Sequence, residues 1–156
     1  MGYLSREITN VASIYQIPVV VIDEQGSLAM KKALAKKFSV NENQPQSLSW
    51  QNLSDAESYH DSDSWRSIGE YVGNQTVLLF VNPEDEQIMW KFNNGNDLNS
   101  VLEETTGFPF CVTSSQADYI LCFEDYDCLL GKGSAAAWVK ELREKKQDIK
   151  ANNREY

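Results

Sequence analysis

The sequence predicts a single α+β domain in which helices pack against an antiparallel sheet of about four strands. The chain has 156 residues, of which 42% are hydrophobic, so it is long enough to bury one core. Short apolar runs separated by turn-forming residues indicate strands. Stretches with apolar residues three or four positions apart indicate amphipathic helices. We assign residues 1–150 to the domain and residues 151–156 to a frayed, charged tail.

The first third of the chain predicts a helix, a strand and a second helix. Apolar residues recur at helical spacing over 4–15. Pro18 ends this helix because a proline disfavours helical geometry at the residue before it. The β-branched run IPVVVI, residues 17–22, predicts a short buried strand. Ser27 is the expected cap of a helix that reaches Phe38. Its lysines are expected to face solvent: Lys31, Lys32, Lys36 and Lys37.

The segment 41–64 is polar and rich in Ser, Asn and Asp. It predicts a long loop with a helical turn near residues 52–59. Loops of this length in compact domains are usually functional or mobile. The apolar positions in 65–72 then predict a short helix that ends at Gly73.

Most of the sheet is expected after residue 75. The run TVLLFV and the alternating run QIMWKF, joined by the turn NPEDE, predict a hairpin. Asn96 or Asp97 caps the next helix, which Gly107 closes. The segments FPFCVT and DYILCFE predict two more strands. Residues 125–133 are expected to form a loop, and Ser134 to start the last helix.

Three cysteines are present: Cys111, Cys122 and Cys128. Their odd number and their apolar neighbours predict reduced, buried thiols, as in a cytosolic protein. The N-terminal sequence lacks the basic and apolar regions of a secretory signal. No apolar run approaches the ~20 residues of a membrane span. The expected compartment is therefore the cytoplasm, without membrane attachment.

Acidic residues are concentrated in the middle of the chain. Residues 38–131 hold 16 Asp and Glu residues but only Arg66 and Lys91 as bases, a formal charge of −14. The two ends together carry +5, and the whole chain carries −9. Nucleic acid is an unfavourable ligand for such a chain because its phosphates require Lys and Arg. A central region of one sign favours a basic protein partner.

Little in the sequence points to catalysis. His60 is the single histidine, so it is the only imidazole base for a cysteine nucleophile. His60 with Asp61 and Asp63 could form a metal or base site, but solvated polar residues on a flexible loop explain them better. The segment GKGS lacks the upstream glycine of a phosphate-binding loop. We expect no enzymatic activity, no cofactor and no bound metal.

The second half of the chain, about residues 75–133, has a recognisable order of elements. A hydrophobic strand, an acidic turn and a strand with a tryptophan are followed by a helix and by GFPFCVTSSQADYILCFEDYDCLLGKG. This order resembles the C-terminal half of small bacterial immunity proteins, the antidotes of polymorphic and contact-dependent growth inhibition toxins. The resemblance implies a cytosolic, non-enzymatic inhibitor that blocks one cognate toxin, often a basic nuclease.

The expected toxin-binding surface combines carboxylates with aromatic rings, since this mixture suits Arg and Lys side chains of a partner. It comes from two segments, 55–63 and 118–127, with Trp50 as a further candidate anchor. The candidate residues are Asp55, Glu57, Tyr59, Asp61, Asp63, Asp118, Tyr119, Glu124, Asp125, Tyr126 and Asp127.

Two other functions remain open at the level of sequence. One is a small adaptor or regulatory module that binds a basic protein segment. The other is a hydrolase that uses carboxylates, with or without a metal near His60.

Overall fold

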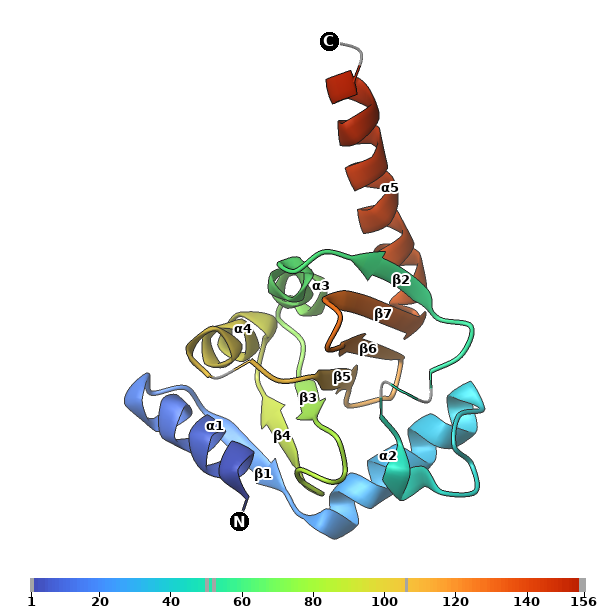
Figure 1. Ribbon diagram of the computed structural model, residues 1–156. Coiled ribbons are helices and arrows are strands. Elements are labelled where there is room, and N and C mark those ends of the chain that lie inside the picture. The colour runs from blue at the N-terminus through green and yellow to red at the C-terminus, as the bar shows by residue number, and fades with distance from the viewer. Residues whose placement is uncertain (1, 50, 52, 106, 155–156) are drawn as a thin grey trace.

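The α+β prediction is confirmed by the computed structural model, which describes residues 2–49, 51, 53–105 and 107–154. Within these residues, seven strands form one antiparallel sheet in the order β1-β4-β3-β5-β6-β7-β2 (Figure 1). The strands are β1 (Val19–Ile22), β2 (Glu57–His60), β3 (Val77–Phe80), β4 (Met89–Phe92), β5 (Phe110–Ser114), β6 (Tyr119–Phe123) and β7 (Cys128–Gly133).

The sheet has more than the expected four or so strands: all five predicted strand segments belong to it, and β2 and β7, which were predicted as loop or helical turn, add two more. The two strands pair with each other although they are far apart in the sequence. Tyr59 lies opposite Leu129, which is 70 positions further along the chain. β-Structure depends on such pairing more than on intrinsic preference, so the polar segment ESYH becomes a strand.

Five α-helices surround the sheet in the described part of the chain. They are α1 (Tyr3–Ile14), α2 (Glu24–Phe38), α3 (Ile68–Val72), α4 (Gly95–Glu104) and α5 (Ala136–Arg154), with 3₁₀ turns η1 (Pro45–Ser47) and η3 (Ser64–Ser67). The caps lie upstream of the predicted ones. Asp23 accepts a hydrogen bond from the Gly26 amide at 2.8 Å, and Asn94 accepts one from Asp97 at 2.8 Å. Each cap satisfies an amide that a helix start leaves unpaired.

Alternate residues of a strand point to opposite sides of the sheet, and both sides carry an apolar cluster. Leu79 and Trp90 join one apolar cluster with residues of α1, α3, α4 and α5. Leu78 and Phe80 join the other, beneath Leu34 of α2. Figure 1 shows α1, α3 and α4 on one side and α2 on the other. None of the helices in the described residues is long and apolar enough to cross a membrane.

Two sequence predictions about burial are wrong. Lys31 does not face solvent: it is only 2% exposed, and its Nζ lies 5.8 Å from the centroid of the Phe80 ring. This burial lowers the pKa of the Lys31 amine. β1 was predicted to be buried, but it is an edge strand that pairs with β4, and Val20 and Val21 are exposed.

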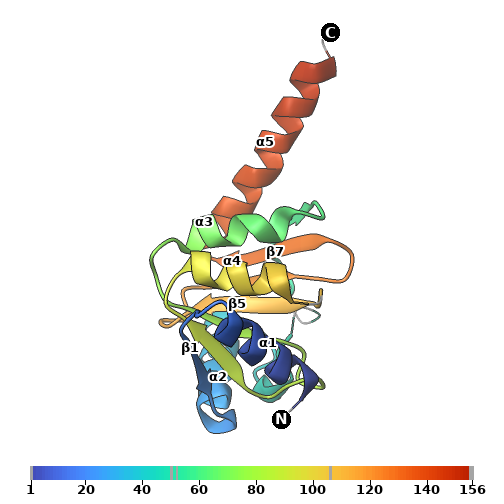
Figure 2. The ribbon, with the colours of Figure 1, turned by 90° about the vertical axis from the view of Figure 1, so that its left-hand side faces the viewer.

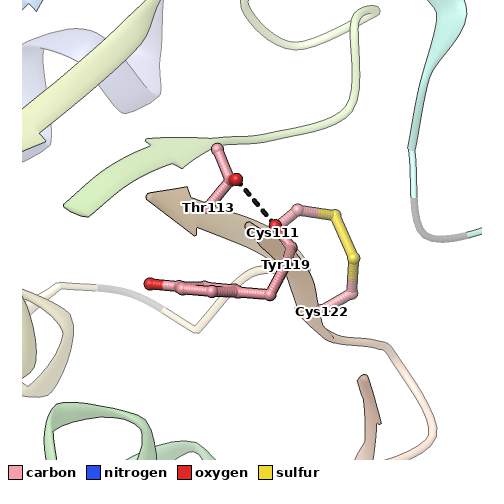
Figure 3. Close-up of a disulfide and its surroundings, with 4 residues drawn as sticks. All are labelled: Cys111, Thr113, Tyr119 and Cys122. Atoms are coloured by element: carbon pink, nitrogen blue, oxygen red, sulfur yellow. Dashed lines mark hydrogen bonds between the residues drawn. A yellow bond between two sulfur atoms is a disulfide. The ribbon is translucent and has the colours of Figure 1, made fainter. Parts of the chain in front are cut away.

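The prediction of three reduced thiols is also wrong. Cys111 and Cys122 form a disulfide, and only Cys128 is free (Figure 3). The two bonded residues lie directly opposite each other in the β5–β6 hairpin, with Cα atoms 4.1 Å apart. The hairpin register brings the sulfur atoms together, whereas the sequence argument weighed only the number of cysteines and their neighbours. The thiols therefore no longer argue for a reducing compartment.

The last helix is longer than expected. α5 continues to Arg154, whereas the sequence placed residues 151–156 in a frayed tail. Its first turns lie against β2 and β7, and the rest projects away from the sheet (Figures 1 and 2).

Candidate protein-binding surface

The candidate residues divide between two ends of the strands β6, β7 and β2. The amide of Asp61 donates to the carbonyl of Asp127 at 2.9 Å, which places segment 61–63 beside the turn 124–127. Tyr119 pairs with Gly133 at the other end of β6. Because strands rise about 3.3 Å per residue, the two ends are roughly 13 Å apart. The candidate residues therefore lie in two groups, separated by about the length of β6.

We call the first group the acidic end and the second the distal group. The acidic end contains Tyr59, Asp61, Asp63, Glu124, Asp125, Tyr126 and Asp127. The distal group contains Asp55, Glu57, Asp118 and Tyr119. Trp50 lies outside the described residues.

The distal group is mainly structural. Arg143 binds Glu57 at 2.9 Å, and Lys37 lies 3.9 Å from Asp118. Tyr119 is 6% exposed and packs edge-on against Tyr71, with ring centroids 5.2 Å apart. Figure 3 shows its ring pointing away from the disulfide, while its carbonyl accepts a hydrogen bond from Thr113 at 2.6 Å. Only Asp55 in this group is exposed and without an ion pair among the described residues.

Asp61 connects the sheet to α5 through its contact with Lys146. Its carboxylate accepts hydrogen bonds from the Asp63 amide at 2.8 Å, from Lys146 at 3.0 Å and from the Tyr59 hydroxyl at 3.0 Å. The Asp63 amide is the main cause of the lowered pKa of Asp61, and Lys146 adds to it. Burial and the bond to Asp61 raise the pKa of Tyr59 to about 12. Both residues therefore hold the fold together.

α5 also covers the outer edge of β2. Arg143 donates to the carbonyl of Ser58 at 2.8 Å, and Lys146 donates to that of His60 at 3.4 Å. Unpaired carbonyls of an edge strand otherwise invite another strand to pair with them. We call these contacts the α5 clamp.

The turn 124–127 carries carboxylates that no described Lys or Arg side chain neutralises. Across the described residues, Glu124, Asp125 and Asp127 have no Lys or Arg within 4.0 Å. The backbone of the turn is nevertheless ordered. The Asp127 amide donates to Glu124 at 3.1 Å, and the Glu124 amide donates to Cys128 at 3.0 Å. Tyr126 is 72% exposed beside them.

An aromatic groove adjoins this turn. Two neighbouring cavities of about 180 and 220 Å³ share Gly107, Phe108 and Phe123 as lining residues. The first also contacts Trp65 and Phe110, and the second reaches the carboxylates of the turn. We call the set Trp65, Gly107, Phe108, Phe110 and Phe123 the aromatic groove. The structure thus places apolar rings next to unpaired negative charge.

The sequence analysis did not include the groove in the binding site. It assigned Phe108, Phe110 and Phe123 to strands, and Trp65 to the short helix over 65–72. The signal available in the sequence was the position of Phe123 directly before Glu124 and Asp125. The approach of Gly107 and Phe108 to this turn is a tertiary contact and could not be predicted from it.

Of the residues considered for catalysis, His60 lies directly opposite Cys128 in the register of β2 and β7. His60 is exposed on β2, and among the described residues no three His, Cys, Asp or Glu side chains gather to hold a metal ion. The pKa of the Cys128 thiol is raised, mainly by burial and also by Glu124, which disfavours the thiolate that a nucleophile needs.

Comparison with known proteins adds no family to this description. No protein-family model, no curated protein and no solved structure matches the chain. The fold and the surface define it as an α+β protein with an acidic, aromatic end.

Proposed function

We propose that this protein binds a basic protein toxin through the acidic end and thereby neutralises it. The observation that carries the proposal is the ordered turn with unpaired Glu124, Asp125 and Asp127 next to the aromatic groove. Hot spots of protein interfaces combine buried aromatic anchors with charged pairs in this way.

The charge of the chain supports a partner of opposite sign. With a net charge of −9, the protein attracts a basic surface at long range, which speeds association. An inhibitor needs this speed to capture a toxin before it acts. A nuclease suits the role because it must carry Lys and Arg to hold phosphates, and an acidic inhibitor competes for them.

Co-expression with the product of the neighbouring gene tests this function. We expect a one-to-one complex and protection of growth by the wild-type chain. The double variant E124Q/D125N should lose both because it removes two unpaired charges without changing size. The matched control is E144Q/D148N, which removes the same charges from exposed positions of α5.

The outcomes separate the alternatives. A complex that forms equally well with E124Q/D125N would place the interface elsewhere. A complex with several unrelated basic proteins, without protection of growth, would identify an adaptor instead of a toxin inhibitor.

A further inference from the structure

We propose that the aromatic groove holds one arginine side chain of the partner, with its guanidinium against the carboxylates of the turn 124–127. This inference rests on the proposed function and specifies the chemistry of the contact. It concerns the groove defined above, which no other part of the described chain fills.

The groove is lined by neighbouring aromatic rings. Phe110 is buried, and the ring centroids of Phe108 and Phe123 each lie 6.2 Å from that of Phe110. Trp65, Phe108 and Phe123 are only half-buried, so part of each residue faces solvent. A Cβ placed on Gly107 would meet no atom within 4 Å. The space above Gly107 is therefore open.

The charges around the groove select a cation. Glu124, Asp125 and Asp127 line the second cavity and have no basic partner in the described residues. A purely apolar side chain would remove water from these carboxylates without replacing the lost hydrogen bonds, which costs free energy. A cation in the same place satisfies them and contacts the negative faces of the aromatic rings.

The chain already binds one of its own guanidinium groups in this manner. Arg66 Cζ lies 4.5 Å from the Trp65 ring centroid, and its Nη1 lies 3.2 Å from Glu103 Oε1. Trp65 and Glu103 also line the first cavity. Phe123 and Glu124 likewise line one cavity together, and none of the described basic residues forms an ion pair with Glu124.

Arginine fits better than lysine for two reasons. Its planar guanidinium stacks on aromatic rings, and its fork of donors can bind two carboxylates at once. Lysine offers a compact, strongly hydrated charge that loses more solvation on entering an aromatic groove.

The test uses N-acetyl-arginine amide as a probe of the free protein, followed by amide and indole NMR signals. We expect saturable shifts confined to residues 107–110 and 123–127 and to the Trp65 indole. N-acetyl-lysine amide should bind more weakly, and the uncharged N-acetyl-citrulline amide should not bind detectably.

Two variants make the test specific. G107L fills the open space, and E124Q/D125N removes charge while leaving the groove unblocked. Each should weaken binding of the probe roughly tenfold, since each removes the ring contacts or the charge-assisted contacts. The control E144Q/D148N should bind like the wild type. Amide spectra of each variant establish that it is folded.

Several results would overturn the inference: no saturable binding, equal binding of N-acetyl-leucine amide or of the lysine probe, or unchanged binding by G107L. The proposed function can survive each of these, because a basic toxin could contact the turn without entering the groove. If instead the probe binds as expected but no basic protein partner is captured or neutralised, the proposed function fails and the groove remains an arginine site.

Discussion

Lys31 shows how a single residue departs from an otherwise ordinary helix pattern. It belongs to a run of lysines on α2, yet it lies under the helix against Phe80 and is 2% exposed. It forms no ion pair with any of the described residues. A cation in this position costs free energy, which is why its pKa is lowered.

Replacing Lys31 with methionine should therefore stabilise the protein. We expect K31M to raise the free energy of unfolding by about 1 kcal/mol near pH 7, because it fills the same space without a buried charge. The gain should shrink as the pH rises. Between the folded pKa and 10.5 the unfolded chain binds a proton that the folded chain does not, so wild-type stability increases with pH in this window.

Urea unfolding of both proteins between pH 7 and 10 measures this difference, with the exposed neighbour changed in K32M as the control. A variant K31M that is less stable than the wild type at every pH would contradict the assignment of Lys31 as a destabilising buried base.

At the scale of elements, the sequence predicted those strands that have a recognisable local pattern of apolar residues. The apolar runs of β3, β5 and β6 stand out because both faces of the sheet are covered there. β2 has no such pattern: its residues are polar, and it exists because β7 pairs with it and the α5 clamp covers its edge. The register of the β5–β6 hairpin decided that Cys111 and Cys122 meet.

Removal of the α5 clamp should expose the edge of β2. The double variant R143A/K146A should lower the free energy of unfolding by about 1 kcal/mol, a modest value because these pairs are partly solvated. It should also speed hydrogen exchange in residues 57–60 and favour self-association through the freed edge. The control K140A changes an exposed lysine of the same helix.

Exchange measured by mass spectrometry together with light scattering reports both effects. Unchanged exchange in β2 would mean that the pairing with β7 alone holds the strand.

The disulfide should be detectable by counting the cysteines that react with a thiol reagent. Denatured protein without reductant should react at Cys128 only, and reduction should expose all three cysteines. The variant C111A/C122A should lose about 2 kcal/mol of stability, because the bond closes a short loop whose entropy the unfolded chain otherwise keeps. Three reactive thiols in unreduced protein isolated under air would contradict the bonded state.

At the scale of the whole molecule, charge and fold combine into a surface that neither defines alone. The composition predicted an acidic protein, but several carboxylates form ion pairs within the chain, with Lys37, Arg66, Arg143 and Lys146. Carboxylates without an ion pair among the described residues remain at several places, such as Glu84 and Asp85, and those of the turn 124–127 are the ones that adjoin the aromatic groove. The aromatic groove beside it could not be predicted from the sequence, because its walls come from η3, from the segment before β5 and from the end of β6.

The most direct test of the proposed surface is calorimetric titration of the captured partner into wild-type protein and E124Q/D125N. We predict binding at least ~30-fold weaker for the variant, about 2 kcal/mol, as for truncation of buried charge pairs in interfaces. The association of the wild type should weaken with added salt, and E144Q/D148N should bind like the wild type. Equal affinities of wild type and E124Q/D125N would contradict the assignment of the acidic end as the binding surface.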